Sequence, residues 1–471
     1  MGAPAPPGSP AGVVRWRGCA GHRGWQCATL SVPLDWARPG RLITLALTRH
    51  RATDASHRLG SLVLNPGGPG ASGIGFAYDA VANLLDPVLV RSFDVVGFDP
   101  RGVGESTPVI CTDGRTLDRI NHVDPVLDTP AKLAAGLAAA RELAAACQAR
   151  SGWLLPFLST RDQARDLDAI RAALGDATLS YAGFSYGTLL GAQYATLFPT
   201  HVRALALDGA EDPAVGSLAV DAAQASGFEH ELDAFLADCA AQGGGCPFRA
   251  AGAPTLRGAF DALVARIRAR PLRAGHGRVL GPGEALFGVA WPLYLQATWP
   301  DLAAALAAAQ NGDGGPLLQQ FDGYIGRDAH GAYTNEEVAN SAISCIDAPP
   351  PTVAAMQAAE PALAAASPYF GPPLAFQDLT CSVWPVAPTA PVGPLHATGA
   401  PPILVVGSTG DPATPYTWAQ GLASEVGSGV LLTRHGNGHS AYPASACARA
   451  AIDRYLTDLT VPTGAAADCA A

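Results

Sequence analysis

The chain has 471 residues, of which 48% are hydrophobic and 15% are charged, and its formal net charge is −10. This composition supports a large packed core, and the length favours two or three structural units over one ordinary domain. The negative charge and the lack of a Lys/Arg cluster exclude the electrostatic footprint of nucleic-acid or anionic-membrane binding.

The N-terminal residues 1–12 are rich in Pro, Gly and Ala, which predicts a flexible segment. They contain neither the basic region nor the apolar stretch of a secretory signal peptide. No run of about 18 or more uncharged apolar residues occurs in the sequence, so no membrane-spanning helix is expected.

Two segments of alternating polarity follow, at residues 26–36 and 41–51, and the Pro39-Gly40 turn between them predicts an antiparallel hairpin. Helical stretches such as residues 131–149 and 160–174 then alternate with short apolar runs, which are typical of parallel strands buried on both faces. The predicted parallel strands are residues 61–65, 93–99, 179–185, 204–209, 402–408 and 429–435. The expected fold class is α/β, with a mostly parallel central sheet and an antiparallel start.

Between Gly209 and Pro402 this alternation of strands and helices stops. Ala-rich helical patterns alternate there with Gly/Pro-rich breaks, and the segment is rich in Trp and Tyr. An independent C-terminal domain does not fit, because two strand-like runs follow the segment and are needed to complete the sheet. We therefore predict an inserted, largely helical lid.

The ten cysteines fall in chain order as neighbouring pairs, which suits disulfides formed in an oxidising compartment. The predicted pairs are Cys19–Cys27, Cys111–Cys147, Cys239–Cys246, Cys345–Cys381 and Cys447–Cys469. The alternative is ten buried thiols in a cytoplasmic enzyme. No C-x-x-C occurs, so zinc-finger and thioredoxin-like sites are not expected.

A nucleophile motif follows the apolar run LSYAGF: residues 183–187 read Gly-Phe-Ser-Tyr-Gly, a match to G-x-S-x-G that leads into a helical segment. In this motif the serine occupies a strained turn between strand and helix, where bulk at either glycine would clash. Ser185 is therefore predicted to be a nucleophile; the alternative is a serine that only caps a helix.

The nucleophile needs a base and an acid, which in this arrangement follow it along the chain at strand ends. His439 comes directly after one strand-like run and Asp411 directly after another, so they are the predicted base and acid. Asp208, at the end of ALALDG, is the rival acid and is otherwise interpreted as a loop-holding aspartate. His435 and His439 form H-x-x-x-H, but two glycines between them argue against a metal-binding helix, so no metal or other cofactor is expected.

A glycine-rich loop, NPGGPG at residues 65–70, follows the first parallel strand and is suited to an oxyanion hole, because glycines let backbone amides approach the substrate oxygen. The predicted donors are the amides of Tyr186 and Gly68, with Gly67 as the alternative to Gly68. Residues 68–73 also spell G-x-G-x-x-G, which is typical of dinucleotide binding. A cofactor-binding fold would explain only this loop, whereas a hydrolase also explains Ser185 and its partners.

Six motifs together resemble the secreted tripeptidyl aminopeptidases of actinomycetes, relatives of the prolyl aminopeptidases with a characteristic C-terminal region. The motifs are NPGGPGASG, FDVVGFDPRGVGEST, YAGFSYGTLLG, SCIDAP, GSTGDPATPY and GNGHSAY, and the resemblance spans about residues 14–470. It implies an α/β-hydrolase core with a helical lid, the triad already predicted, export, and exopeptidase action on peptides with a free amino terminus.

On this basis the chain is divided into a flexible segment, a two-part hydrolase core and a lid between the two parts. The boundaries are residues 1–12 for the segment, 13–210 and 396–471 for the core, and 211–395 for the lid. Export implies a secreted protein whose signal peptide is not in this sequence, with a cytoplasmic protein as the alternative.

Related aminopeptidases recognise the substrate amine through lid carboxylates, and the resemblance makes Glu336, Glu337 and Asp347 the candidates here. A solvated helix start with acidic residues at its positive end is the alternative for this segment. The expected partner is a peptide or small-molecule substrate, with no nucleic acid and no membrane, and the expected oligomeric state is a monomer. The alternative function is a carboxylesterase or amidase that uses the same triad.

Overall fold

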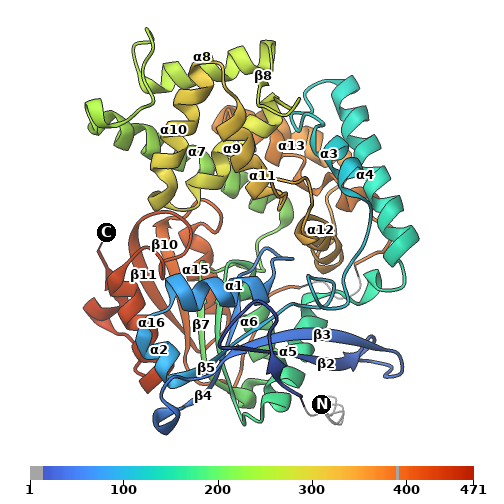
Figure 1. Ribbon diagram of the computed structural model, residues 1–471, viewed down its shortest axis with the longest axis vertical. Coiled ribbons are helices and arrows are strands. Elements are labelled where there is room, and N and C mark those ends of the chain that lie inside the picture. Colours follow the sequence, from blue (N-terminus) through green and yellow to red (C-terminus); the bar gives the residue numbers. More distant parts are fainter. Residues whose placement is uncertain (1–13, 389–391, 471) are drawn as a thin grey trace.

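The computed structural model describes residues 14–388 and 392–470 (Figure 1). The predicted flexible segment, residues 1–12, lies outside this range. Within the range, no helix combines the length and the apolar character needed to cross a bilayer.

A ten-stranded sheet forms the centre of the molecule, in the order β1-β2-β3-β5-β4-β6-β7-β10-β11-β12. The strands are β1 (Arg17–Gly18), β2 (Trp25–Pro33), β3 (Leu42–His50), β4 (Gly60–Asn65), β5 (Phe93–Phe98), β6 (Leu179–Phe184), β7 (Val202–Asp208), β10 (Ile403–Gly410), β11 (Gly429–Asn437) and β12 (Asp468–Cys469). Pairing is antiparallel from β1 to β5 and parallel from β5 to β12. The predicted fold class is confirmed. The two-residue edge strands β1 and β12 are additions that were not predicted.

Helices cover both faces of the sheet, and the alternation of side chains along the strands explains why. On β4, Val63 packs with the helices of one face, whereas Leu62 and Leu64 pack with those of the other. The first face is covered by α5 (Thr160–Leu174), α6 (Tyr186–Leu197) and α15 (Tyr416–Glu425), and the second by α1 (Gly73–Asp79), α2 (Pro87–Ser92) and α16 (Ala446–Asp458). Strands buried on both faces have the continuous apolar runs seen in the sequence.

Between β7 and β10 the chain is mostly helical and lies above the carboxyl ends of the parallel strands (Figure 1). The elements are α7 (Ser217–Ala241), α8 (Leu256–Ala269), β8 (Leu272–Arg273), β9 (Val279–Leu280), α9 (Pro282–Leu293), α10 (Trp299–Gln310), α11 (Gly315–Tyr324), α12 (Glu336–Asp347), α13 (Val353–Ala366) and α14 (Gly371–Leu374). Helices α7 to α11 enclose a hydrophobic core of their own, in which Phe235 and Trp299 meet edge to face with ring centroids 5.8 Å apart.

Helix α12 lies within this helical stretch of the sequence, yet it packs with the sheet. Val338, Ala342 and Ile346 belong to the same hydrophobic cluster as α5 and α6. The helix approaches the glycine-rich loop so closely that a Cβ at Gly70 would lie 2.6 Å from the Glu336 carbonyl oxygen.

Between β5 and β6, α3 (Gly114–Asn121) and α4 (Pro130–Ser151) pack with the core of the sheet through Leu117 and Leu143, and α4 also reaches the lid segment. Ala140 on α4 packs in one cluster with Met356, Phe376 and Leu379 from the lid segment. The cap over the sheet is therefore built from two separate stretches of the sequence.

A buried ion pair fixes α5 against the strands. Arg101 is fully buried and donates to both carboxylate oxygens of Asp166 at 2.6 Å. Its remaining donors reach the carbonyls of Pro33, Leu34 and Phe157 at 2.8–3.1 Å. Because every donor has an acceptor, the desolvated guanidinium is fully compensated, and the start of α5 is held beside the nucleophile turn.

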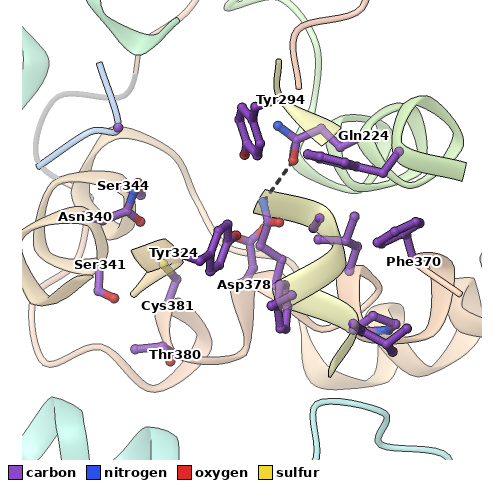
Figure 2. A pocket seen from close by; sticks show the side chains of 18 residues that line it. Gln224, Tyr294, Tyr324, Asn340, Ser341, Ser344, Phe370, Asp378, Thr380 and Cys381 are labelled. Atoms are coloured by element: carbon purple, nitrogen blue, oxygen red, sulfur yellow. Dashed lines mark hydrogen bonds between the residues drawn. The ribbon is translucent and has the colours of Figure 1, made fainter. Parts of the chain in front are cut away.

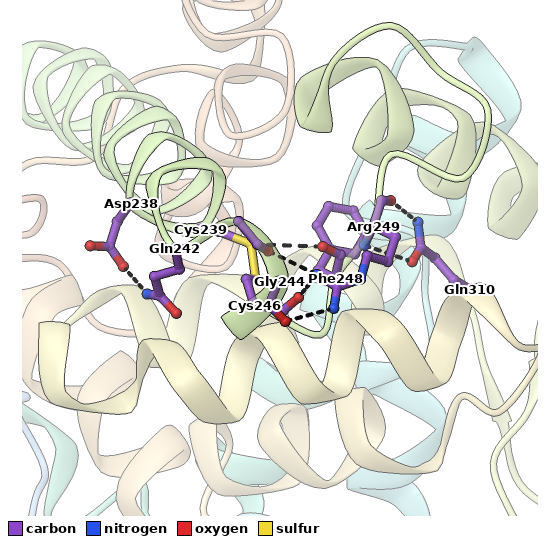
Figure 3. The surroundings of a disulfide bond; sticks show 9 residues. Asp238, Cys239, Gln242, Gly244, Cys246, Phe248, Arg249 and Gln310 are labelled. Atoms are coloured by element: carbon purple, nitrogen blue, oxygen red, sulfur yellow. Dashed lines mark hydrogen bonds between the residues drawn. A yellow bond between two sulfur atoms is a disulfide. The ribbon is translucent and has the colours of Figure 1, made fainter.

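Five disulfides join the described cysteines in the chain-order pairs Cys19–Cys27, Cys111–Cys147, Cys239–Cys246, Cys345–Cys381 and Cys447–Cys469. Around Cys239–Cys246, Arg249 donates to the carbonyls of Gly244 and Cys246, and its own carbonyl accepts from Gln310 at 2.7 Å (Figure 3). Five disulfides and no free thiol among the described cysteines are typical of an oxidising, extracytoplasmic environment.

We expect the disulfides to stabilise the fold unequally, because the entropy removed from the unfolded chain grows with loop length. Cys111–Cys147 spans 36 residues and Cys239–Cys246 spans 7. On the loop model, replacing each pair by alanines lowers the free energy of unfolding by about 4 and about 2.5 kcal/mol, respectively. Guanidinium unfolding of the two double variants measures this difference, and alkylation of native thiols in the parent would contradict the disulfides themselves.

Candidate active site

The nucleophile turn joins β6 to α6, and Ser185 has φ 54° and ψ −128°. This left-handed conformation is rare for a residue other than glycine and places the side chain above the end of the sheet. The flanking glycines are required by space, since a Cβ at Gly183 would lie 2.4 Å from the Gly187 carbonyl oxygen and one at Gly187 would lie 2.8 Å from that of Asn65. The Ser185 amide donates to the Asp208 carbonyl at 3.0 Å, which ties the turn to β7.

The predicted acid and base lie together at the ends of β10 and β11. Nδ1 of His439 lies 2.9 Å from each carboxylate oxygen of Asp411. The same carboxylate accepts the amides of Ala413, Thr414 and Ser440 at 2.8–3.1 Å. These contacts fix the proton of the neutral imidazole on Nδ1 and leave Nε2 as the basic atom.

Asp208, the rival acid, has a different role. Its carboxylate oxygens accept the amides of Ala441 and Tyr442, each at 2.8 Å, and burial raises the pKa of this carboxyl to about 6. It thereby holds the segment directly after His439, as expected for a loop-holding aspartate. His435 does not join His439 in a site: its Nε2 lies 2.6 Å from Asp468 Oδ1.

The lid contacts the base directly. The His439 amide donates to the Tyr294 carbonyl at 2.6 Å, and the Tyr294 ring meets the imidazole edge to face at 5.6 Å between centroids. Tyr294 ends α9, where backbone carbonyls have no partner within the helix and can accept from outside it. The His439 side chain is 11% exposed, so the lid and the sheet together cover most of it.

Burial lowers the pKa of His439, but the charges of Asp411, Asp208 and Glu211 raise it by more, and the net pKa lies above 6.5. Glu211 itself is buried, which raises its pKa to about 7. Neither Asp208 nor Glu211 touches the imidazole through a hydrogen bond among the described residues; both act through their charge.

The geometry distinguishes between the two predicted loop donors. The Gly67 amide donates to Asn65 Oδ1 at 2.9 Å and is therefore occupied. Gly68 lines a cavity whose lining includes Tyr294, the contact of His439, but neither Ser185 nor His439 itself. A Cβ at Gly67 would lie 3.0 Å from the Tyr186 amide nitrogen, which heads α6 and has no acceptor within that helix. Tyr186 and Gly68 thus remain the candidate donors.

A cavity of about 280 Å³ extends from Gly68 into the lid (Figure 2). Its wall combines aromatic and aliphatic side chains with hydroxyls, amides and one carboxylate. The lining residues are Gly68, Gln224, Phe228, Leu286, Phe287, Ala290, Tyr294, Tyr324, Asn340, Ser341, Ser344, Phe370, Pro373, Leu374, Gln377, Asp378, Thr380 and Cys381.

The three carboxylates proposed from the resemblance lie outside this lining. Asp347 accepts the amide of Thr160 at 2.9 Å and also its hydroxyl, which in turn bonds Tyr186. Glu337 accepts from Asn121 at 2.9 Å, and burial raises its pKa to about 7. Burial also raises the pKa of Glu336, which has no side-chain hydrogen bond among the described residues.

Comparison with known sequences places the chain in a class. Residues 60–250 match the α/β hydrolase fold family, and residues 367–469 match the TAP-like protein family. The protein is therefore an α/β-hydrolase.

The chain is 37% identical to serine protease Hip1 of Mycobacterium tuberculosis, with 96% of this chain and 90% of that protein covered. It is 38% identical to carboxylesterase B of the same species over 93% and 85% of the two chains. The tripeptidyl aminopeptidase of Streptomyces coelicolor is 33% identical over 94% and 83%. The chain belongs to this family of α/β-hydrolases with a TAP-like C-terminal region, which includes the tripeptidyl aminopeptidases.

We expect Ser185→Ala to abolish turnover and labelling by a fluorophosphonate, and Asp411→Asn to lower kcat by about 10⁴-fold because the imidazole loses its orienting carboxylate. Asp208→Asn should keep most of the activity and instead lower stability by about 1–3 kcal/mol, since it removes one of two acceptors for buried amides. A deeper loss of kcat in Asp208→Asn than in Asp411→Asn would show that the acid is misassigned.

The pH dependence follows from the raised pKa of His439. A protonated imidazole cannot accept the serine proton, so kcat/KM should fall with decreasing pH through a midpoint above 6.5. Asp208→Asn removes a negative charge that raises this pKa, and the midpoint should then move to lower pH. Profiles of kcat/KM between about pH 5 and 9 measure both effects, and a midpoint that is not raised above that of an ordinary histidine would contradict the raised pKa of His439.

Proposed function

We propose that the protein is a secreted serine exopeptidase that cleaves amide bonds near the free amino terminus of peptides through an acyl-enzyme. The observation that carries the catalytic part is the Asp411–His439 pair, with both carboxylate oxygens 2.9 Å from Nδ1, at the end of β10, whose neighbour β7 is bonded to the strained Ser185 turn. Relatives at 33–37% identity named as a serine protease and a tripeptidyl aminopeptidase support the peptide substrate.

In the proposed first half-reaction, Ser185 Oγ attacks the scissile carbonyl carbon while His439 Nε2 accepts the hydroxyl proton. The carbonyl oxygen becomes an oxyanion, and the amides of Tyr186 and Gly68 stabilise it. When the tetrahedral intermediate collapses, the C–N bond breaks and His439 gives its proton to the leaving amine. The acyl group remains on Ser185 as an ester.

In the second half-reaction a water molecule attacks the ester while His439 accepts its proton. Collapse returns that proton to Ser185 Oγ and releases the N-terminal fragment as a carboxylic acid. Asp411 keeps the imidazole oriented throughout and stabilises its protonated form. The Tyr294 carbonyl holds the His439 backbone during both steps.

The lid favours an exopeptidase over an endopeptidase. The cavity that begins at Gly68 is walled on its other sides by lid residues from α7, α9, α11 and α12. A cavity of about 280 Å³ is at the small end of ligand pockets and holds only a short piece of chain. Substrates would therefore enter by one end, with the longer product outside.

A carboxylesterase is the second candidate, and the 38% identity to carboxylesterase B favours it. Ester and amide hydrolysis need the same nucleophile, base and oxyanion donors, so the triad alone does not distinguish them. The five disulfides and the tripeptidyl aminopeptidase relative support secretion over a cytoplasmic location.

The proposal predicts that blocking the substrate amine lowers kcat/KM by at least about tenfold, because a buried contact to the ammonium group is lost. We would measure the release of a fluorescent amine from Ala-Ala-Pro and Ala-Ala-Ala conjugates, free and acetylated, beside hydrolysis of a p-nitrophenyl ester. Equal rates on free and acetylated peptides would refute the exopeptidase, and turnover of the ester alone would establish the carboxylesterase.

A further inference from the structure

The cavity wall carries an unbalanced charge. Among the described residues that line it, Asp378 has the only ionisable carboxylate and no side chain is basic. The rest of its polar surface consists of amides and hydroxyls, such as the amides of Gln224 and Asn340 labelled in Figure 2. A cavity of this kind favours a ligand that carries a positive charge.

Asp378 is held in place from two sides. The Ser217 hydroxyl, at the start of α7, donates to its Oδ2. Three residues further along the chain, Cys381 forms the disulfide to Cys345 on α12. The carboxylate is thus positioned by a hydrogen bond and a covalent link, and its second oxygen has no hydrogen bond within the described residues.

A second carboxylate lies behind it. Asp221 is on the same face of α7 as Ser217 and Gln224, one turn from each, and its side chain is almost entirely buried, with 1% exposed. Its Oδ2 has no hydrogen-bond partner among the described residues. Burial raises the pKa of Asp221 to about 8, and the charge of Asp378 contributes to the rise. No ion pair within the described residues involves either Asp221 or Asp378.

Burial of Asp221 favours its neutral, protonated form, whereas a cation bound beside Asp378 would favour the ionised form of both groups. We propose that Asp378, supported by Asp221, binds the terminal ammonium group of the peptide substrate. The site would accept primary ammonium groups. Phe228 on α7 and Phe370, whose ring centroids are 5.6 Å apart in the cavity wall, would contact apolar side chains of the bound residues.

This inference rests on the proposed exopeptidase function and assigns its amine-binding residue. It replaces the three carboxylates named from the sequence, which lie outside the cavity lining. Both oxygens of Asp347 accept from Thr160 and Glu337 accepts from Asn121, whereas Glu336 is set aside only because it does not line the cavity. Asp378 escaped the sequence analysis because FQDLTCSVW has no motif or periodicity that marks it.

The test compares Asp378→Asn, Asp221→Asn and Glu337→Gln with the parent on free and acetylated Ala-Ala-Ala conjugates and on p-nitrophenyl acetate. Asp233→Asn is the matched control, because it makes the same change on α7 at a residue whose side chain is 60% exposed. Asp378→Asn should lower kcat/KM for the free-amine peptide by about tenfold or more, mainly through KM, and leave ester hydrolysis within about twofold. Asp221→Asn should show a smaller loss of the same kind.

The acetylated peptide separates a charge contact from a structural role. Asp378→Asn should not lower kcat/KM for the acetylated peptide any further. The ratio of kcat/KM for the free peptide to that for the acetylated peptide should therefore fall toward one. A parent preference that survives in both aspartate variants, or is removed by Glu337→Gln, would overturn the assignment and leave the exopeptidase intact. Equal losses on the peptide and the ester would show that Asp378 is merely structural. A parent without any preference for the free amine would refute the proposed function together with this inference.

Discussion

The active site depends on the close approach of three backbone segments at the carboxyl edge of the sheet. The glycine-rich loop after β4 touches the nucleophile turn, since a Cβ at Gly67 would lie 2.5 Å from the Phe184 carbonyl oxygen. The turn is bonded to β7 through the Ser185 amide. A Cβ at Gly209, directly after β7, would meet the imidazole of His439 at 2.9 Å. Ser185, His439 and the glycine-rich loop, the proposed nucleophile, base and source of an oxyanion donor, are thus placed by backbone packing, which side-chain motion cannot relax.

The cap also contacts the loops at this edge of the sheet. Gly227 on α7 lies so close to Pro412, the residue after Asp411, that a Cβ at Gly227 would be 2.6 Å from the Pro412 carbonyl oxygen. Asn335, before α12, binds the carbonyls of Gly102 and Val109 and thereby fixes the loop after β5. The cap therefore meets the core through specific backbone contacts at several points, and the cavity between them has a defined shape.

Much of the fold, and the pairing of Asp411 with His439, could be predicted from the sequence because the signals are local. The buried strands are continuous apolar runs ended by turn residues, and Ser185 lies in a five-residue motif whose glycines are required by space. The placement of α12 and α4 could not be predicted, because it depends on contacts between distant segments that leave no periodic pattern. Asp378 was missed for the same reason: its partners Ser217 and Asp221 lie far away in the sequence.

The hydrogen bond from the His439 amide to the Tyr294 carbonyl bears on how such lids can change in evolution and in engineering. If α9 ended at another residue, the His439 amide would lose its acceptor, the Tyr294 carbonyl, whatever side chains the helix carried. Exchange of whole lids between relatives therefore has to preserve the end point of this one helix. Variation in substrate preference is then most easily tolerated in the walls of the cavity, through side-chain changes that leave the path of the backbone alone.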